Sequence, residues 1–272
     1  MKNICSLIAI SLLLAAGACT RPATKASADT DDDTMAETTV AAAAADTALT
    51  PNIPFEYREF EKEKGNYKLE VAYPTAGNPE LVTAVRTWIN EQLTGTYKGS
   101  LDDPEAFFRH YSANLGEDPD LNEYGGYTID EFEPEWVNDF VVTYDHTSYI
   151  YEGGAHGSGG SYGTTFLQAD GTIFTKNCFT SYKPLHKLFV EGLKRYFKVG
   201  TDAELMEQLL GVKTLAKLAP PAINPWIVEG GVVFSYTPYE IAPYSAGSPH
   251  FTIPFADLEP YLTADGKRFF GI

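Results

Sequence analysis

Cysteine is scarce in this chain of 272 residues, which holds only Cys5, Cys19 and Cys178. The first two lie within or directly after an apolar N-terminal segment that is typical of an export signal. Cys178 is left without an intramolecular partner, so a disulfide framework is excluded and the folded body must rely on its core. We expect Cys178 to be a buried, inert thiol.

Basic residues are also few, because 20 Lys and Arg stand against 37 Asp and Glu, a formal charge of −17. Residues 50–272 alone hold 17 basic and 31 acidic residues. This balance argues against nucleic acid and against anionic membrane surfaces as partners. It favours basic partners or cations, although solubility by itself would also explain an acidic surface.

Long hydrophobic runs are missing except for Ile8–Ala16, which is too short to span a membrane as a finished helix. Lys2 precedes this run, as in bacterial export signals. The segment Ala16-Gly17-Ala18-Cys19 follows at the end of this run. It resembles the lipobox of bacterial lipoproteins, whose cysteine is lipidated. The alternative is an ordinary cleaved signal. We interpret residues 1–18 as a lipoprotein signal peptide and Cys19 as the lipidation site, which would anchor the protein to a membrane of the bacterial envelope, on its periplasmic or surface face.

Large apolar residues are nearly absent from residues 19–52, so we expect a disordered tether there. The following residues are rich in aromatics and predict strands, two helices, a β-meander, two further helices and a final hairpin. The predicted helices cover 78–96, 103–115, Pro184–Phe197 and Thr201–Leu210. This order predicts the α+β class, with antiparallel sheets, helices packed on one face, and two intimately packed subdomains over residues 53–155 and 156–272.

The usual sequence signatures of catalysis and metal binding are missing. The five histidines show no zinc-ligand spacing, and no nucleophile motif is present. The acidic stretch Glu117–Gly126 lacks the EF-hand pattern and reads as a solvated loop. Gly157–Ser161 lacks the lysine and the following helix of a phosphate-binding loop. We therefore assign no catalytic residue, no metal ligand and no cofactor.

Glycine is concentrated in Tyr149–Gly163, which holds six glycines with His156 at its middle. Glycine permits positive φ and close backbone approach, so this loop is either a structural corner or a recognition surface. His156 could pair with Glu240 or Glu152 as acid and base. A structural histidine is the alternative that we favour, because no group is seen to orient either carboxylate.

A second unusual loop, Thr237–Pro249, places a proline directly before Tyr239 and again before Tyr244. Proline fixes φ and stiffens the approach to each ring. Rigid tyrosines give contact area at low entropic cost, as in antibody paratopes. The alternative is a structural cover over a sheet edge.

These two loops also carry a resemblance. GGAHG after a YxY strand, followed by PYEIAPYSAG and a short FTIPF strand, resembles the RsiV-like extracytoplasmic domain, a domain of unknown function. Residues 55–150 resemble the companion domain that precedes the catalytic unit in PdaC-type peptidoglycan deacetylases. RsiV is an anti-sigma factor whose outer domain binds lysozyme. The resemblance implies ligand-facing residues at Gly153, Gly154, Ala155, His156, Gly157, Pro238, Tyr239, Glu240, Pro243 and Tyr244.

The anti-sigma role and the deacetylase activity are not expected here, because the segments that carry them are not seen in this sequence. The leading hypothesis is a lipid-anchored envelope binding module for a basic, lysozyme-like muramidase. The alternatives are a peptidoglycan- or glycan-binding module, with tyrosines stacking on sugars, and a hydrolase that uses His156 with a carboxylate. Recognition by the two loops requires that they lie side by side.

Overall fold

The computed structural model describes residues 54–61, 67–114 and 126–272. The predicted signal peptide, Cys19 and the tether over 19–52 lie outside the described residues, as does the acidic loop of residues 117–125.

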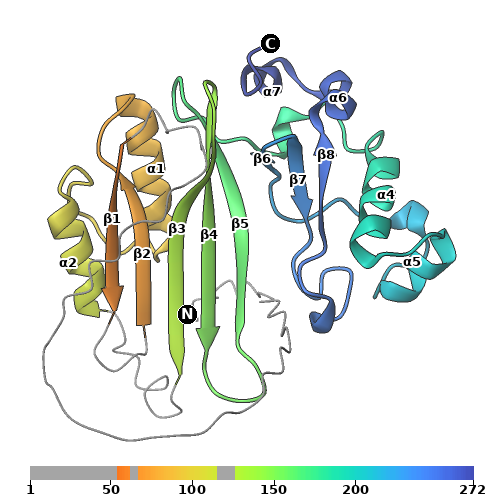
Figure 1. Ribbon diagram of the computed structural model, residues 1–272, viewed down its shortest axis with the longest axis horizontal. Coiled ribbons are helices and arrows are strands. Elements are labelled where there is room, and N and C mark those ends of the chain that lie inside the picture. Colours follow the sequence, from red (N-terminus) through yellow and green to blue (C-terminus); the bar gives the residue numbers. More distant parts are fainter. Residues whose placement is uncertain (1–53, 62–66, 115–125) are drawn as a thin grey trace, which may run out of the picture. The chain divides into compact units, whose positions relative to one another are not determined.

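A five-stranded sheet in the order β1-β2-β3-β4-β5 forms the first layer (Figure 1). Its strands are β1 (Phe55–Glu61), β2 (Tyr67–Pro74), β3 (Tyr127–Val137), β4 (Val141–Tyr151) and β5 (Ser158–Leu167). The predicted α+β class is confirmed. The sheet is not wholly antiparallel, however, because β2 and β3 run parallel. Helices α1 (Pro79–Gln92) and α2 (Pro104–Asn114) connect these two strands, and a long helical crossover of this kind is what a parallel pair requires.

Helix α1 begins at a well-formed cap and buries one face. The Asn78 side chain accepts a hydrogen bond from the Glu80 amide at 2.9 Å, and a proline follows at the first helical position. The buried face packs on the sheet, where the Trp88 ring meets Phe132 and Phe166 edge to face. Each such fully buried large side chain contributes roughly 1.5–3 kcal/mol through the hydrophobic effect. One face of the five-stranded sheet is thereby covered.

A three-stranded antiparallel sheet forms a second layer with its own helices. Its strands are β6 (Trp226–Val228), β7 (Gly231–Ser235) and β8 (His250–Pro254), and its helices are α4 (His186–Phe197), α5 (Asp202–Gln208), α6 (Phe255–Leu258) and α7 (Ala264–Arg268). Helix α4 packs closely on β8, since a Cβ at Gly192 would overlap the Phe251 ring. Phe189 and Phe234, 4.9 Å apart between ring centroids, lie in the same core. Cys178 is buried and free, as expected.

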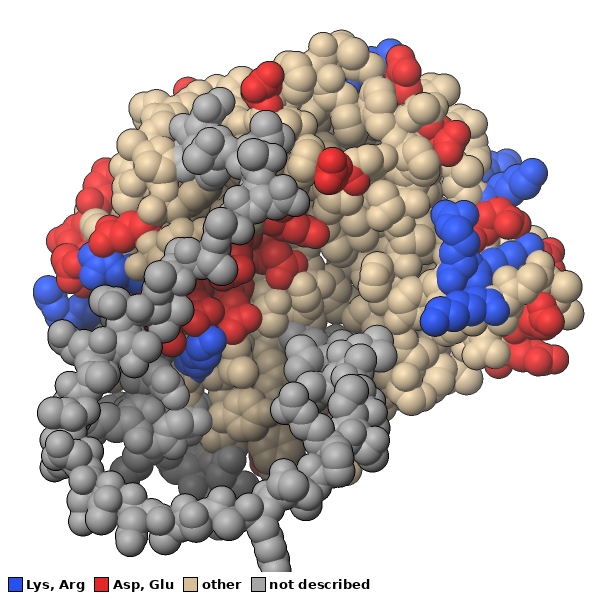
Figure 2. Space-filling model, in the orientation of Figure 1, with Lys and Arg blue, Asp and Glu red and all other residues tan. Residues whose placement is uncertain are grey.

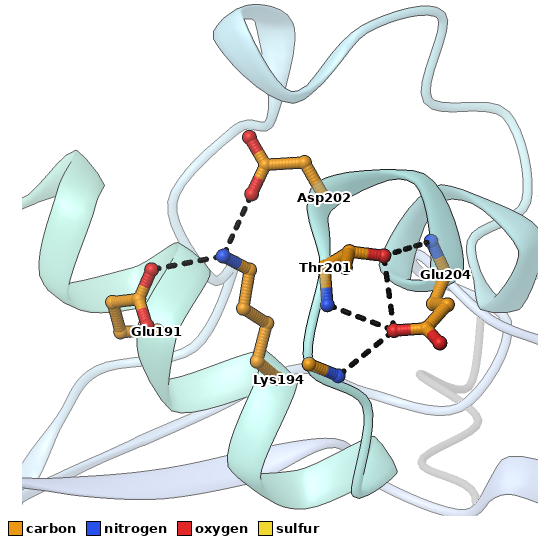
Figure 3. A network of polar contacts seen from close by, with 6 residues as sticks. Glu191, Lys194, Thr201, Asp202 and Glu204 are labelled. Atoms are coloured by element: carbon orange, nitrogen blue, oxygen red, sulfur yellow. Dashed lines mark hydrogen bonds and ion pairs between the residues drawn. The ribbon is translucent and has the colours of Figure 1, made fainter.

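The joint between α4 and α5 is fixed by polar contacts (Figure 3). The hydroxyl of Thr201 accepts from the Glu204 amide, and the Glu204 carboxylate accepts from the Thr201 amide at 2.8 Å, which completes a capping box. Lys194 bridges Glu191 at 3.0 Å and Asp202 at 2.7 Å. The predicted helix start at Thr201 is confirmed.

Two buried threonines join the five-stranded sheet to β6. Thr143 donates to the Ile227 carbonyl at 2.6 Å, and the Ile227 amide donates to the Thr165 hydroxyl at 2.8 Å. The two hydroxyl oxygens are 2.7 Å apart. Because the Thr143 hydroxyl already donates its hydrogen bond to the carbonyl, the Thr165 hydroxyl is the donor between the two. Every polar group at this buried junction therefore has a partner. The division of the body at residue 155 stays a prediction, and β5, which follows it, pairs with β4.

Candidate binding surface

The glycine loop and the tyrosine loop lie in contact. Residues 152–157 join β4 to β5, and residues 236–249 join β7 to β8. The Tyr244 hydroxyl donates to the Gly157 carbonyl at 2.7 Å. The rings of His156 and Tyr244 are stacked, with centroids 4.2 Å apart and an interplanar angle of 16°. The expected proximity of the two loops is confirmed, whereas their role in ligand binding remains a prediction.

A third ring extends this stack. Tyr239 lies against Tyr244 with centroids 5.7 Å apart, so His156, Tyr244 and Tyr239 form a continuous arrangement, named here the ring row. The Tyr239 side chain is 63% exposed. Its backbone has φ 66°, a left-handed conformation that costs a non-glycine residue about 1–2 kcal/mol. This conformation belongs to a β-turn that the Glu240 amide closes on the Thr237 carbonyl at 3.0 Å, and the turn presents a large aromatic side chain to water.

Glu240 shapes the tyrosine loop from within. One carboxylate oxygen accepts from the Ala222 amide at 2.7 Å, and the other accepts from the amide and the hydroxyl of Thr237 at 2.9 and 3.0 Å. The His156 ring instead donates from Nδ1 to the Gly157 carbonyl, 2.9 Å away. Both oxygens of Glu240 are thus engaged with the chain that holds the loop.

The other predicted residues of the two loops divide into exposed and buried positions. Gly153 and Gly154 adopt φ of 91° and 97°, which glycine tolerates best, and Gly154 and Ala155 are exposed. Gly157 is buried, and a Cβ there would overlap the Tyr149 hydroxyl. Pro238 is buried beneath Tyr239, while Pro243 is half-buried. The glycines thus let the first loop close on the ring row.

Further tyrosines extend the surface, and two of them were not assigned from the sequence. Tyr127 lies 5.5 Å from Tyr149 and 5.8 Å from Tyr151 between ring centroids, and the Tyr151 hydroxyl donates to the Gly154 carbonyl at 3.0 Å. Tyr127 and Tyr151 are opposite each other in the β3–β4 register. The sequence does place tyrosines at the beginning of β3 and at the end of β4. Predicting that these tyrosines meet required knowing that the two strands pair.

Acidic side chains line the part of the five-stranded sheet that faces away from α1 and is not covered by β6, called here the open face. Side chains alternate along a strand, so Glu70, Glu131 and Glu133 point away from the core residues Leu69, Val71 and Phe132 between them. Glu70 pairs with Glu131, and Glu133 pairs with Asp145, across neighbouring strands. Figure 2 shows acidic side chains gathered over β3 and β4.

The chemistry of the open face follows from these like charges. Desolvation, followed by the charges of Glu70, Glu131 and Asp145, raises the pKa of Glu133. Lys68 offsets part of the repulsion through ion pairs with Glu70 at 2.7 Å and Glu131 at 3.2 Å. Within the described ranges, no group of three or more His, Cys, Asp and Glu side chains is placed to hold a metal ion. None of the described helices is long and apolar enough to cross a membrane.

Comparison with known proteins finds a family match over part of the second half of the chain. No curated protein matches the sequence. Among solved structures, a DUF3298 family member from Bacteroides fragilis matches with a TM-score of 0.62 and 18% identity over 82% of this chain and 99% of the other. A DUF3298 family protein from Pseudomonas aeruginosa matches with a TM-score of 0.54 and 18% identity over 79% and 96%. At these identities the likeness shows the fold alone. Residues 172–256, which contain α4, α5 and β6 to β8, match the family described as "Protein of unknown function (DUF3298)".

Proposed function

We propose that this protein is a lipid-anchored binding module of the bacterial cell envelope, and that the ring row recognises a basic protein of the lysozyme-like muramidase class. The observation that carries the proposal is the ring row itself, because two loops from different sheets meet there and present Tyr239 to solvent.

Preorganisation of the two loops supports a role in recognition. The Tyr244 hydroxyl is bound to the glycine loop, and Glu240 bonds the tyrosine loop to the Ala222 and Thr237 backbone. Rings that are already fixed lose little freedom on binding, so more of the contact energy appears as affinity. Tyrosines are also frequent among the few residues that dominate the energy of protein interfaces.

The distribution of charge supports a basic partner. Residues 53–155 contain 21 acidic and 7 basic residues, whereas residues 156–272 contain 10 of each. The whole negative charge of the body therefore lies in the half that forms most of the open face. Tyr149, on that face, has its hydroxyl beside Gly157, so the acids and the ring row border each other. A basic partner would be attracted to this surface and would associate faster at low salt.

The envelope setting and the muramidase class rest on sequence. The first comes from the lipobox-like segment that ends at Cys19. The second comes from the resemblance to the RsiV-like domain, with which the DUF3298 match over residues 172–256 is compatible.

The proposal is tested by titrating purified residues 50–272 with a basic lysozyme in a calorimeter, at low and at moderate salt. We expect binding that weakens as salt rises, and Tyr239→Ala should weaken it about tenfold or more. Phe140→Ala is the control, because Phe140 is also an exposed ring, at 43%, but lies in the turn between β3 and β4, at the other end of β4 from the ring row. Absence of binding at both salt concentrations would refute the muramidase class.

A glycan-binding role is the second candidate, and the cluster of Tyr127, Tyr149 and Tyr151 beside the ring row favours it. Sedimentation with insoluble peptidoglycan separates the two. A protein-binding module should stay in the supernatant, whereas a glycan-binding module should sediment and lose this property in a Tyr127→Ala variant.

A further inference from the structure

A pocket of about 470 Å³ lies at the end of the five-stranded sheet where the parallel strands β2 and β3 begin, beside the end of α1 and the side chains of α2. This volume is within the usual range for small-molecule sites. The pocket belongs to the helix-covered face of the sheet. Asp130 lies two residues before the buried Phe132 on β3, so both side chains are on that face. It is therefore separate from the open face and from the ring row.

Asp130 supplies the charge of this pocket and is held in place by two donors. Its side chain is only 13% exposed, and that of His146 only 12%. His146 donates from Nε2 to one carboxylate oxygen at 3.0 Å, and the Tyr67 hydroxyl donates to the other at 3.1 Å. Desolvation and the charge of Asp130 raise the pKa of Tyr67, so this hydroxyl keeps its proton and remains a donor. The His146 ring is fixed in turn by stacking on Phe132 at 4.1 Å.

The Asp130 carboxylate retains unused acceptor capacity. A carboxylate offers about four lone-pair positions, and donors among the described residues occupy two of them. No lysine or arginine lines the pocket among the described residues. The described partners of this carboxylate are the imidazole of His146 and the hydroxyl of Tyr67, and its remaining lone pairs favour a ligand that brings positive charge and donors.

The remaining walls are suited to a hydroxylated ligand. The lining is mainly apolar, with aromatic surface from Tyr67 and Tyr111. Its other members include an amide and three hydroxyl side chains together with an imidazole and an aliphatic residue, namely Gln92, Thr94, Thr96, Thr128, His110 and Leu93. Aromatic faces attract cations and also pack on the C–H faces of small rings.

Thr94 lines the pocket at the C-terminal end of α1. Its φ is 84°, in the left-handed region, which is a genuine outlier for a β-branched residue. It follows the last residues of α1, at a place where glycine or asparagine is usual. This conformation ends the helix, because the Gly95 amide donates to the Asn90 carbonyl at 2.7 Å. The Thr94 hydroxyl lies 3.3 Å from that of Thr96, which itself contacts His110 at 3.0 Å.

We propose that this pocket binds a small hydroxylated organic cation of the amino-sugar class, whose ammonium group pairs with Asp130 while its hydroxyls bond the threonines and Gln92. This site is independent of the proposed protein-binding function, because it lies on the other face of the sheet and uses none of the residues of the ring row.

The test compares glucosamine with N-acetylglucosamine by calorimetry on the full chain at about pH 6, where an alkylamine is protonated. The two sugars share their ring and other hydroxyls, but only the first is a cation. We expect glucosamine to bind about tenfold more tightly, since a charge-assisted hydrogen bond to a buried carboxylate is lost in the neutral sugar. Asp130→Asn, which keeps size and shape, should remove this difference and leave the affinity for N-acetylglucosamine unchanged.

A second variant keeps the test decisive if Asp130→Asn does not fold. Thr128→Val removes a hydroxyl from the pocket and should weaken glucosamine binding severalfold, whereas Thr252→Val, at an exposed position on β8, should not. Equal affinity for the two sugars, or no glucosamine binding by the folded wild-type protein at millimolar concentration, would overturn the proposal. Lysozyme binding through the ring row should be the same in Thr128→Val as in wild type, so failure of one site is distinguishable from failure of the other.

Discussion

Three non-glycine residues adopt left-handed backbone conformations within the described part of the chain, and they differ in what explains them. Lys198 closes helix α4 as its C-cap, which is an ordinary use of this conformation. Tyr239 is the third residue of a β-turn that the Glu240 amide closes on the Thr237 carbonyl at 3.0 Å. Thr94 follows the C-cap of α1, where the Gly95 amide donates to the Asn90 carbonyl at 2.7 Å. Glycine is the usual residue at both positions, and the two larger residues found there lie in the ring row and at the Asp130 pocket.

Replacing Tyr239 by glycine tests whether the strain is kept for function. Glycine relieves about 1–2 kcal/mol of backbone strain, and its greater entropy in the unfolded chain takes back about 0.5–1 kcal/mol. We expect the free energy of unfolding to stay unchanged or to rise by up to about 1 kcal/mol, as measured by urea denaturation.

Binding should move in the opposite direction, because the exposed ring is lost. Tyr57→Gly is the control, since Tyr57 lies in strand β1, where glycine is expected to lower stability. Loss of more than about 1 kcal/mol in Tyr239→Gly would mean that the ring stabilises the fold, and that the strain needs no functional explanation.

At the scale of elements, capping signals predicted helix starts well and their ends less well. The Asn78-Pro79-Glu80 sequence placed the start of α1, and Thr201 with Glu204 placed that of α5. Helix α1 was expected to continue to residue 96 but ends at Gln92, because Thr94 and Gly95 turn to left-handed conformations. Threonine gives no signal for that turn, so the boundary could not be read from the sequence.

Strand partners were harder to predict than the strands themselves. A run of alternating residues specifies two faces but not its neighbour, so the parallel pairing of β2 with β3 was missed. The open face was missed for the same reason, because Glu70 lies beside Glu131 only through that pairing, and Asp145 lies beside Glu133 only through the pairing of β3 with β4. The contact between the two loops was predictable because both showed unusual glycine, proline and tyrosine content.

The threonine pair between β5 and β6 gives a prediction about how these elements hold together. Thr165→Val keeps the side-chain shape but removes the acceptor for the Ile227 amide, which is buried. A buried donor without a partner costs about 1–3 kcal/mol, so we expect a loss of that size in the free energy of unfolding.

Thr164→Val is the matched control, because Thr164 is the neighbouring residue on the opposite face of β5 and is only half-buried. Its effect should stay within about 0.5 kcal/mol. Equal losses in both variants would show that β5 tolerates valine poorly in general, and that the hydrogen bonds to β6 add little.

At the scale of the whole molecule, charge and chemistry are divided between the two halves. Residues 156–272 are neutral in sum, and Figure 2 shows their basic side chains gathered near α4 and α5. Residues 53–155 carry the acidic excess, part of it as facing carboxylates on the open face. Such self-repulsion lowers the stability of the free protein, and a basic partner would remove it, so the acidic face links stability to binding.

This repulsion predicts an unusual dependence of stability on pH. The pKa of Glu133 is raised by desolvation and like charges, and that of Glu135 by desolvation and Asp145. Carboxyls with raised folded-state pKa bind protons more tightly in the folded protein, so stability falls as pH rises from about 4.5 through their folded pKa. Asp170 acts oppositely, because hydrogen bonds from Thr172 and Arg268 lower its pKa to about 2, and its stabilisation is lost only below about pH 4.

We therefore expect the free energy of unfolding to be higher near pH 5 than near pH 7, as measured by urea titrations at low salt. Glu133→Gln should raise the free energy of unfolding at neutral pH and so reduce the difference between pH 5 and pH 7. Added salt should also reduce this difference, because it screens the repulsion. Glu259→Gln, at an exposed carboxylate of the neutral half, is the control and should leave the profile unchanged. If the wild-type protein is most stable at neutral pH, its carboxylates on the open face do not repel one another appreciably. A basic partner would then not stabilise the protein by neutralising them.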